Sequence, residues 1–256
     1  MKSKTGIAIP VRMDSVRFPG KPLAKILDMP MIQHVWERAR MSKNAYEVVV
    51  ITPDQEIYKF MKELGAKVCI SEFDHPNGTS RVSEFVDELN WKNFVILQGD
   101  EPLVIPNHLD SLIDFVSSNN HEFVNVTSYL SVKDLDDPNV VKCIVNSNSE
   151  IVFMFRNNPL NSKNYIVPRQ FAKVNGLYSI SNKLLKKYNK LAPKDLEVSQ
   201  SIEQFRFIEN EVQIYQFKVE NIGTSVNTKE ELEQVVSILE KENQQIEIME
   251  TYLNGR

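Results

Sequence analysis

The first half of the chain alternates short apolar runs with amphipathic segments. The apolar runs are four to seven residues long, as expected of buried strands, and the segments between them place apolar residues at helical spacing. Alternation of this kind predicts an α/β fold with a mostly parallel sheet. The expected strands are residues 6–9, 47–51, 67–70, 94–97 and 123–129, and the expected helices are residues 31–41, 54–64, 82–89 and 106–117.

The second half has a different pattern. Two apolar runs, 141–145 and 151–155, flank an Asn/Ser-rich turn and predict a hairpin. Further strands are expected at 173–180 and 212–219, and helices at 181–190, 195–206 and 229–243. The polar tail after residue 243 is expected to fray.

A loop rich in proline follows the first strand. Residues 10–23 hold three prolines and a glycine, which keep the segment out of regular structure. The loop also carries Arg12, Arg17 and Lys21. Three cations at the carboxyl end of a strand suit a polyphosphate, because arginine gives two-pronged contacts and lysine a compact charge. The alternative is that they are ordinary solvated surface cations.

Two more polar segments follow strands. Residues 74–81 form a turn-rich stretch that contains a glycine and Arg81, and we interpret it as a loop. The run Gln98-Gly99-Asp100-Glu101-Pro102 comes directly after the expected central strand. A carboxylate at that point is placed to hold Mg²⁺ against phosphate oxygens, although a turn with a helix-capping acid would look the same.

Composition limits the class of protein. The formal net charge is −4, so the chain lacks a general basic surface for nucleic acid and any anion site must be local. The two cysteines, Cys69 and Cys143, lie in apolar surroundings and are expected to be buried thiols. No apolar run reaches the length of a membrane span or of a signal peptide, so we expect a cytoplasmic protein without a membrane partner.

The loop sequence resembles the 3-deoxy-manno-octulosonate (Kdo) cytidylyltransferases. Their pattern R-x-x-S-x-R-F-P-G-K-P-L is matched throughout residues 12–23. Residues 75–81 resemble the family's H-x-S/N-G-T-x-R segment, with Ser80 where an acid is usual, and Gln98–Pro102 matches its Q-G-D-E-P signature. Residues 136–142 and 195–206 resemble two further segments, and the similarity extends from about Ile7 to Leu239. Asp136 and Asp137 are expected to form a turn rather than to bind a ligand.

The resemblance implies a Rossmann-like nucleotidyltransferase fold in a single domain, residues 1–256. A smaller hairpin lobe, at about 130–210, would hold the acceptor and dimerisation region. It also implies a homodimer that joins CTP to the hydroxyl of an acidic sugar with Mg²⁺, releasing pyrophosphate, for lipopolysaccharide or other surface polysaccharide. The implied catalytic residues are Arg12, Arg17, Lys21 and Asp100. The implied CTP contacts are Arg12, Ser15, Lys21, Asn77, Gly78, Thr79, Arg81 and Gln98.

On the acceptor side the resemblance implies Asn175, Glu203 and Gln204, although a solvated helix face explains the last two equally well. The implied metal ligands are Asp100 and Asn227. Asn227 stands where the family has a second carboxylate, and an amide offers a metal only an uncharged oxygen.

The chain also departs from the family where the family faces the sugar acid. Residues 156–163 lack the usual second arginine, Lys163 standing in its place, and residues 174–176 lack the usual histidine. We therefore expect CTP as the nucleotide with Kdo, or a modified Kdo such as an amino-deoxy form, as acceptor. Two alternatives stay open: another acid, such as a nonulosonic acid or a phosphonate, and a non-catalytic nucleotide-binding homologue.

Overall fold

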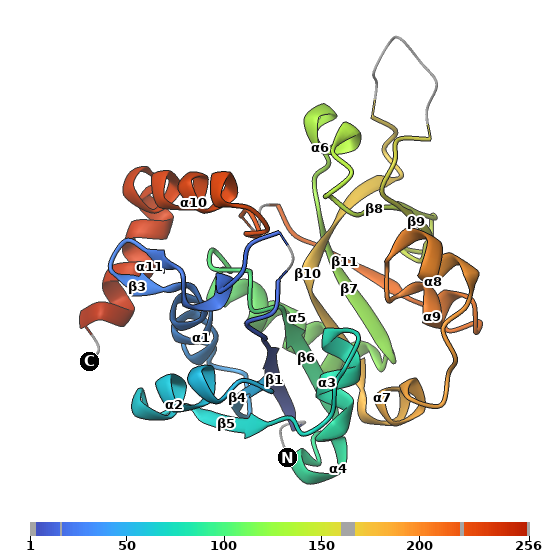
Figure 1. Ribbon diagram of the computed structural model, residues 1–256. Helices are drawn as coiled ribbons and strands as arrows, with labels where there is room; N and C mark the ends of the chain where they lie inside the picture. Colours follow the sequence, from blue (N-terminus) through green and yellow to red (C-terminus); the bar gives the residue numbers. More distant parts are fainter. Residues whose placement is uncertain (1–3, 16, 160–166, 221–222, 255–256) are drawn as a thin grey trace.

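The computed structural model describes residues 4–15, 17–159, 167–220 and 223–254. It has the expected α/β architecture, with a central mixed sheet in the order β11-β7-β10-β6-β1-β4-β5 (Figure 1). β1 pairs in parallel with β4 and β6, and β4 pairs in parallel with β5, whereas β10 runs antiparallel between β6 and β7. The strands are β1 (Thr5–Pro10), β4 (Val48–Thr52), β5 (Lys67–Ile70), β6 (Asn93–Leu97), β7 (Phe123–Ser128), β10 (Phe171–Ser181) and β11 (Tyr215–Lys218).

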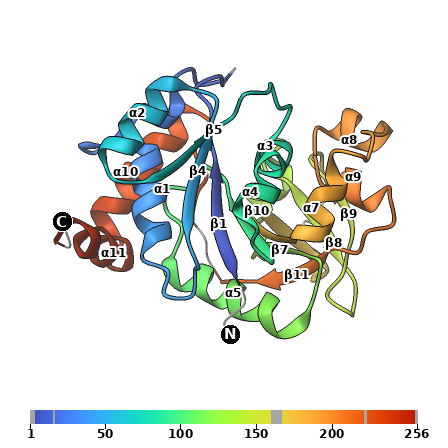
Figure 2. The same cartoon turned by 90° about the horizontal axis from the view of Figure 1, so that it is seen from below.

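Helices cover both faces of the sheet (Figure 2). On one face Ile7 and Ile9 of β1 pack among side chains of α1 (Met31–Arg40), α2 (Gln55–Glu63) and α5 (Pro106–Asn119). On the other face Ala8 packs among side chains of α3 (Gly78–Glu84), α4 (Val86–Leu89) and α7 (Asn182–Tyr188). Burial on both faces explains why the parallel strands are continuous apolar runs rather than alternating ones.

A smaller lobe stands beside the sheet. It holds the predicted hairpin, β8 (Lys142–Val145) and β9 (Ile151–Phe155), together with the short helix α6 (Val132–Asp136). β10 links this lobe to the main sheet, because Phe171–Lys173 pairs with β8 while Leu177–Ser181 pairs with β6. The prediction of a hairpin was confirmed, whereas α6, capped by Ser131, was not predicted.

The predicted helix 195–206 was wrong in its continuity. The structure has α8 (Asp195–Gln200) and α9 (Phe205–Ile208), separated at Ser201, whose φ of 51° is left-handed. Arg156 of the hairpin lobe accounts for the break, since its guanidinium donates to the backbone carbonyls of Gln200 and Ser201. Arg156 therefore satisfies two backbone carbonyls at the end of α8, which would otherwise need N–H partners from a further helical turn.

The predicted loop 74–81 was also wrong in its second half. α3 begins at Gly78, four residues before the expected start at residue 82, because the Asn77 side chain caps it by accepting from the Ser80 N–H at 2.9 Å. The strand expected at 212–219 is reduced to β11, which begins at Tyr215.

The tail, expected to fray, instead forms a packed helix, α11 (Asn243–Asn254), behind α10 (Lys229–Lys241). Tyr252 is buried with its hydroxyl 2.7 Å from His34 Nδ1, and Gln245 Nε2 donates to the Leu103 carbonyl at 3.2 Å. Tertiary contacts therefore stabilise this segment as a helix, although its polar sequence predicted that it would fray. Throughout the described part of the chain, no helix has the length and apolar character needed to cross a bilayer.

Candidate active site

The proline-rich loop is anchored at the carboxyl end of β1. The Met13 N–H donates to Asp54 Oδ2 at 2.8 Å, which ties the loop to the residue preceding α2. Gly20, at φ 72°, then turns the chain into the short 3-10 helix η1 (Lys21–Leu23). This turn carries Lys21 back toward the carboxyl end of β6, where its amine contacts Asp100.

A cavity of about 730 Å³ opens between this loop, the start of α3 and the end of β6. Seven of the residues predicted to contact CTP line it: Arg12, Ser15, Lys21, Asn77, Gly78, Arg81 and Gln98. Arg17 and Asp100, which were predicted to be catalytic, line it as well. We call it the nucleotide cavity. Arg81 is almost fully buried there, and its Nε has no hydrogen-bond partner among the described residues. Burial and, to a smaller extent, the charge of the neighbouring Arg12 lower the Arg81 pKa.

Lys21 and Asp100 form the centre of the cavity wall. Lys21 Nζ lies 2.7 Å from Asp100 Oδ2 and 2.9 Å from the Val226 carbonyl. The Val226 N–H in turn donates to the Asp100 carbonyl at 2.9 Å. The C-terminal segment is thereby fixed against the end of β6, and Asn227 lines the same cavity.

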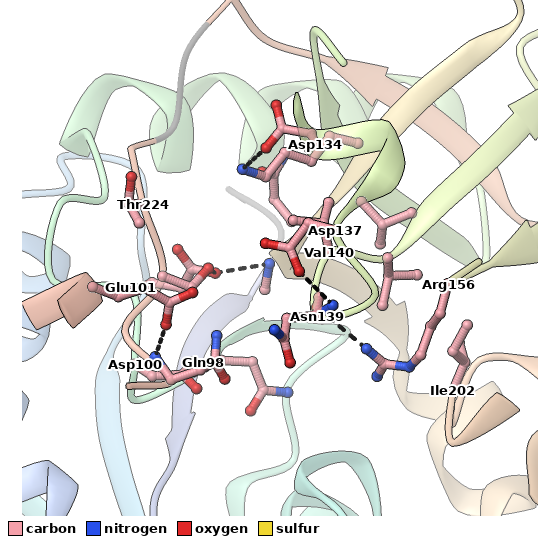
Figure 3. A pocket seen from close by; sticks show the side chains of 18 of the residues that line it. Gln98, Asp100, Glu101, Asp134, Asp137, Asn139, Val140, Arg156, Ile202 and Thr224 are labelled. Atoms are coloured by element: carbon pink, nitrogen blue, oxygen red, sulfur yellow. Dashed lines mark hydrogen bonds and ion pairs between the residues drawn. The ribbon is translucent and has the colours of Figure 1, made fainter. Parts of the chain in front are cut away.

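A second cavity, of about 470 Å³, adjoins the first and reaches into the hairpin lobe. We call it the acceptor cavity. The two cavities share four residues: Gln98, Asp100, Ser201 and Asn227. The predicted acceptor residues Asn175, Glu203 and Gln204 all line it. In Figure 3, Asp100 and Glu101 lie on one side of this space, and Asp137, Asn139 and Arg156 lie on the other.

The predicted CTP contact Thr79 is placed differently. Its side chain is fully buried and is not among those lining the nucleotide cavity. Its hydroxyl lies 2.7 Å from the Tyr178 hydroxyl and donates to Glu203 Oε1 at 2.9 Å, and Tyr178 donates to the same oxygen at 2.9 Å. Thr79 thus supports the floor of the acceptor cavity. Burial raises the pKa of Glu203, although the two hydroxyls oppose the shift.

Glu101 is a buried site residue that the sequence did not single out. Its Oε1 accepts from the Gly176 N–H at 3.0 Å and from the Ser225 hydroxyl at 2.7 Å. Burial, reinforced by the charge of Asp100, raises its pKa to about 7. The close approach requires glycine at 176, because a Cβ there would lie 2.4 Å from Glu101 Oε1. The acid stands in the Gln98–Pro102 run, but only the fold shows that it faces inward.

Arg156 joins the pieces of the acceptor cavity wall. Besides the carbonyls of Gln200 and Ser201, its Nη1 donates to the carbonyls of Pro138 and Asn139, at 3.3 and 3.2 Å. Four backbone carbonyls therefore hold the guanidinium in place, and β9, the loop before β8 and the break after α8 meet at this side chain. Lys163, which follows in the same segment, lies outside the described residues.

Arg17 and Asn227 meet at the border between the two cavities. Arg17 Nη2 donates to Asn227 Oδ1 at 3.0 Å, and Nη1 donates to Asn139 Oδ1 at 2.5 Å. The predicted metal ligand Asn227 therefore lies beside a predicted phosphate-binding arginine. Its backbone N–H donates to Glu231 Oε2 at the start of α10.

The donor set at this border fits Mg²⁺ that is held partly by a nucleotide. Within the described residues no three His, Cys, Asp or Glu side chains gather as a metal cluster. Asp100 nevertheless presents a carboxylate to the nucleotide cavity. Mg²⁺ commonly takes one or two carboxylates and completes its shell with phosphate oxygens and water. Asp100 would hold the ion in that way, beside the cations expected to bind a triphosphate.

Comparison with known proteins agrees with this geometry. Residues 7–222 match the family model described as cytidylyltransferase. The 3-deoxy-manno-octulosonate cytidylyltransferase of Thermodesulfovibrio yellowstonii is 34% identical, over 88% of this chain and 94% of that protein. The enzyme of the same name from Escherichia coli is 31% identical, over 94% of this chain and 98% of that protein.

Solved structures give the same result. The structure of a CMP:2-keto-3-deoxy-manno-octonic acid synthetase complexed with CTP superposes with a TM-score of 0.86 at 30% identity, covering 94% of this chain and all of that one. A cytidylyltransferase from Leptospira borgpetersenii, 18% identical, covers 99% of this chain and 95% of that one, and its TM-score of 0.64 reflects a shared fold.

Proposed function

The chain belongs to the cytidylyltransferase family, and from this premise we propose that it transfers CMP from CTP to a 3-deoxy-2-ketoaldonic acid, Kdo or a modified Kdo. The observation that carries the proposal is the pair of adjoining cavities that share Gln98, Asp100 and Asn227. One is lined with the cations a triphosphate requires, and the other lies in the lobe where the acceptor is expected. The relatives named as Kdo cytidylyltransferases support the choice of acceptor.

The reaction requires the two substrates to be aligned for in-line attack, and it requires no covalent intermediate with the protein. The acceptor's anomeric hydroxyl attacks the α-phosphorus of CTP and releases its proton to solvent, the bond from the α-phosphorus to the β-phosphate oxygen breaks, and pyrophosphate leaves. Arg12 and Lys21 bind and orient the triphosphate, and Gln98 and Asp100, at the shared wall, position the reacting groups. Mg²⁺, when bound, neutralises charge on the phosphate oxygens.

We also propose that the enzyme works as a homodimer and in the cytoplasm. The resemblance to the family supports the dimer. The product would serve the synthesis of lipopolysaccharide or another surface polysaccharide.

The test is pyrophosphate release from CTP and Mg²⁺ with Kdo and with 8-amino-Kdo in parallel, confirmed by mass spectrometry of the CMP-sugar. Product with either acid would establish the reaction, and the faster acid would identify the acceptor. Product only with a nonulosonic acid or a phosphonate would show that the acceptor is not Kdo, while the reaction would still be a CMP transfer from CTP. CTP binding without product from any acid would favour the non-catalytic alternative.

A further inference from the structure

Arg17 carries a positive charge that the described residues do not neutralise. Its two hydrogen-bond partners, Asn139 Oδ1 and Asn227 Oδ1, are both amide oxygens, and no ion pair of Arg17 is present in the described part of the chain. The partners hold the guanidinium from two sides, one from the hairpin lobe and one from the C-terminal segment. Neutral acceptors orient a cation without cancelling its charge.

A second cation lies near it. Burial lowers the Arg156 pKa, and the charge of Arg17 lowers it further. Arg156 is already held by four backbone carbonyls, whereas Arg17 lines the nucleotide cavity and is exposed there. Of these two arginines, Arg17 is therefore the one that can meet an anionic group of a bound substrate.

Asn227, at the same border, is a poor ligand for a metal ion. Its Oδ1 already accepts from Arg17, and its Nδ2 is a donor, which no cation can use. Asp100 differs, because its Oδ2 accepts from Lys21 while its Oδ1 has no partner among the described residues. The side chains at the border thus provide one anionic ligand and one fixed guanidinium.

We propose that this chain binds a single divalent cation with CTP, at Asp100, and that Arg17 supplies the second positive charge at the border with the acceptor cavity. Asn227 and Asn139 are positioning residues that hold the guanidinium there. The inference rests on the proposed function for the identity of the nucleotide. The resemblance already implies that Arg17 is catalytic, and the proposal adds that its charge takes the place of a second metal ion where the transferred phosphate would meet the acceptor.

The first test counts bound ions and needs no acceptor. Mn²⁺ is titrated into protein held in excess over CTP, and free Mn²⁺ is followed by electron paramagnetic resonance. We expect one tightly bound ion per CTP in the wild type. We expect two in Asn227→Asp, because a second carboxylate then stands beside Asp100 and draws an ion to the border.

Asn139→Asp is the matched control, since it also places a carboxylate on Arg17 but from the hairpin lobe. We expect it to keep one ion. Two ions in the wild type, or two in Asn139→Asp, would overturn the proposal. Failure of CTP to bind would instead contradict the proposed function, so the two failures are distinguishable.

A kinetic test isolates the role of the arginine. We expect Arg17→Met to lower turnover roughly 100-fold, the effect of losing one fixed donor at a developing charge, while the ion count stays at one. In the Asn227→Asp background the same change should cost less than tenfold, because the second ion replaces the lost charge. An equal loss of turnover in both backgrounds would show that the Arg17 charge does not take the place of a second metal ion.

Discussion

Lys21 Nζ lies 2.7 Å from Asp100 Oδ2, which joins the loop after β1 to the loop after β6. The same amine donates to the Val226 carbonyl, so one cation ties together three of the segments that line the nucleotide cavity. Both side chains remain partly accessible. The ammonium is thus held in place by its partners while one donor remains for a phosphate oxygen.

We expect Lys21→Met to weaken CTP binding by roughly 10- to 100-fold, the effect of losing one charged hydrogen bond of about 1.5–3 kcal/mol. Isothermal titration with CTP measures the change. The control is Lys25→Met, which removes an exposed lysine from the neighbouring strand β2 (Lys25–Ile26) outside the cavity. Equal affinity in the two variants would mean that Lys21 does not contact the triphosphate.

Glu101 should make the stability of the protein depend on pH. Its pKa is about 7 in the folded protein, raised from an ordinary value of 4.5, so the folded state holds the proton more tightly than the unfolded state. Between these two pH values the folded state binds more protons, and the free energy of unfolding therefore falls as pH rises. The full loss is about 3 kcal/mol, reached above pH 7.

Glu101→Gln cannot titrate and should lack this fall. Urea denaturation at pH 5, 6, 7 and 8 compares the variant with wild type and with Glu56→Gln, a change at an exposed acid of α2. Parallel pH profiles for wild type and Glu101→Gln would show that Glu101 is ionised throughout.

Gly176→Ala should destabilise the fold by about 1–3 kcal/mol, the usual cost of overpacking. The added Cβ would lie 2.4 Å from Glu101 Oε1 and 3.1 Å from Gln98 Cβ, so both cavity residues must shift. Thermal unfolding measures the loss, and turnover should fall with it because Gln98 lines both cavities. Unchanged melting and turnover would mean that the site relaxes freely around a methyl group.

Arg156→Lys tests whether the acceptor cavity depends on one side chain. A lysine cannot reach four carbonyls on two segments, so the break after α8 and the loop before β8 should loosen. We expect the acceptor KM to rise roughly tenfold, the cost of losing about 1.4 kcal/mol of positioning, with CTP affinity unchanged. A rise in the CTP dissociation constant of the same size would point instead to general loss of structure.

The sequence predicted that Lys21 and Asp100 belong to the same site, although it did not predict their contact. Both residues follow apolar runs, and the carboxyl ends of neighbouring parallel strands share one edge of the sheet. Local pattern fixed the strands themselves, as in β5, where the expected and observed ranges coincide at Lys67–Ile70. The roles of the individual cavity residues stay predictions, which the variants above would test.

The acceptor side could not be predicted in the same way. The break at Ser201, which separates α8 from the segment carrying Glu203 and Gln204, is stabilised by Arg156, 45 residues away in the sequence. Glu101 faces inward only because Gly176 of another strand leaves room for it. The helix α11 depends on contacts with His34 and Leu103 rather than on its own propensity. These features depend on distant partners, and a local pattern holds no information about them.

The bond between Lys21 and the Val226 carbonyl spans 205 residues, and this separation sets a time order on the ribosome. A chain that is still being made has its proline-rich loop and its central strands long before residue 226 leaves the exit tunnel. Until then Lys21 and Asp100 lack the segment that closes the cavity wall, and Arg17 lacks Asn227. The site is therefore completed only after residues 226 and 227 have emerged, and a chain cut short before residue 226 would carry the strands of the sheet without a finished place for the reaction.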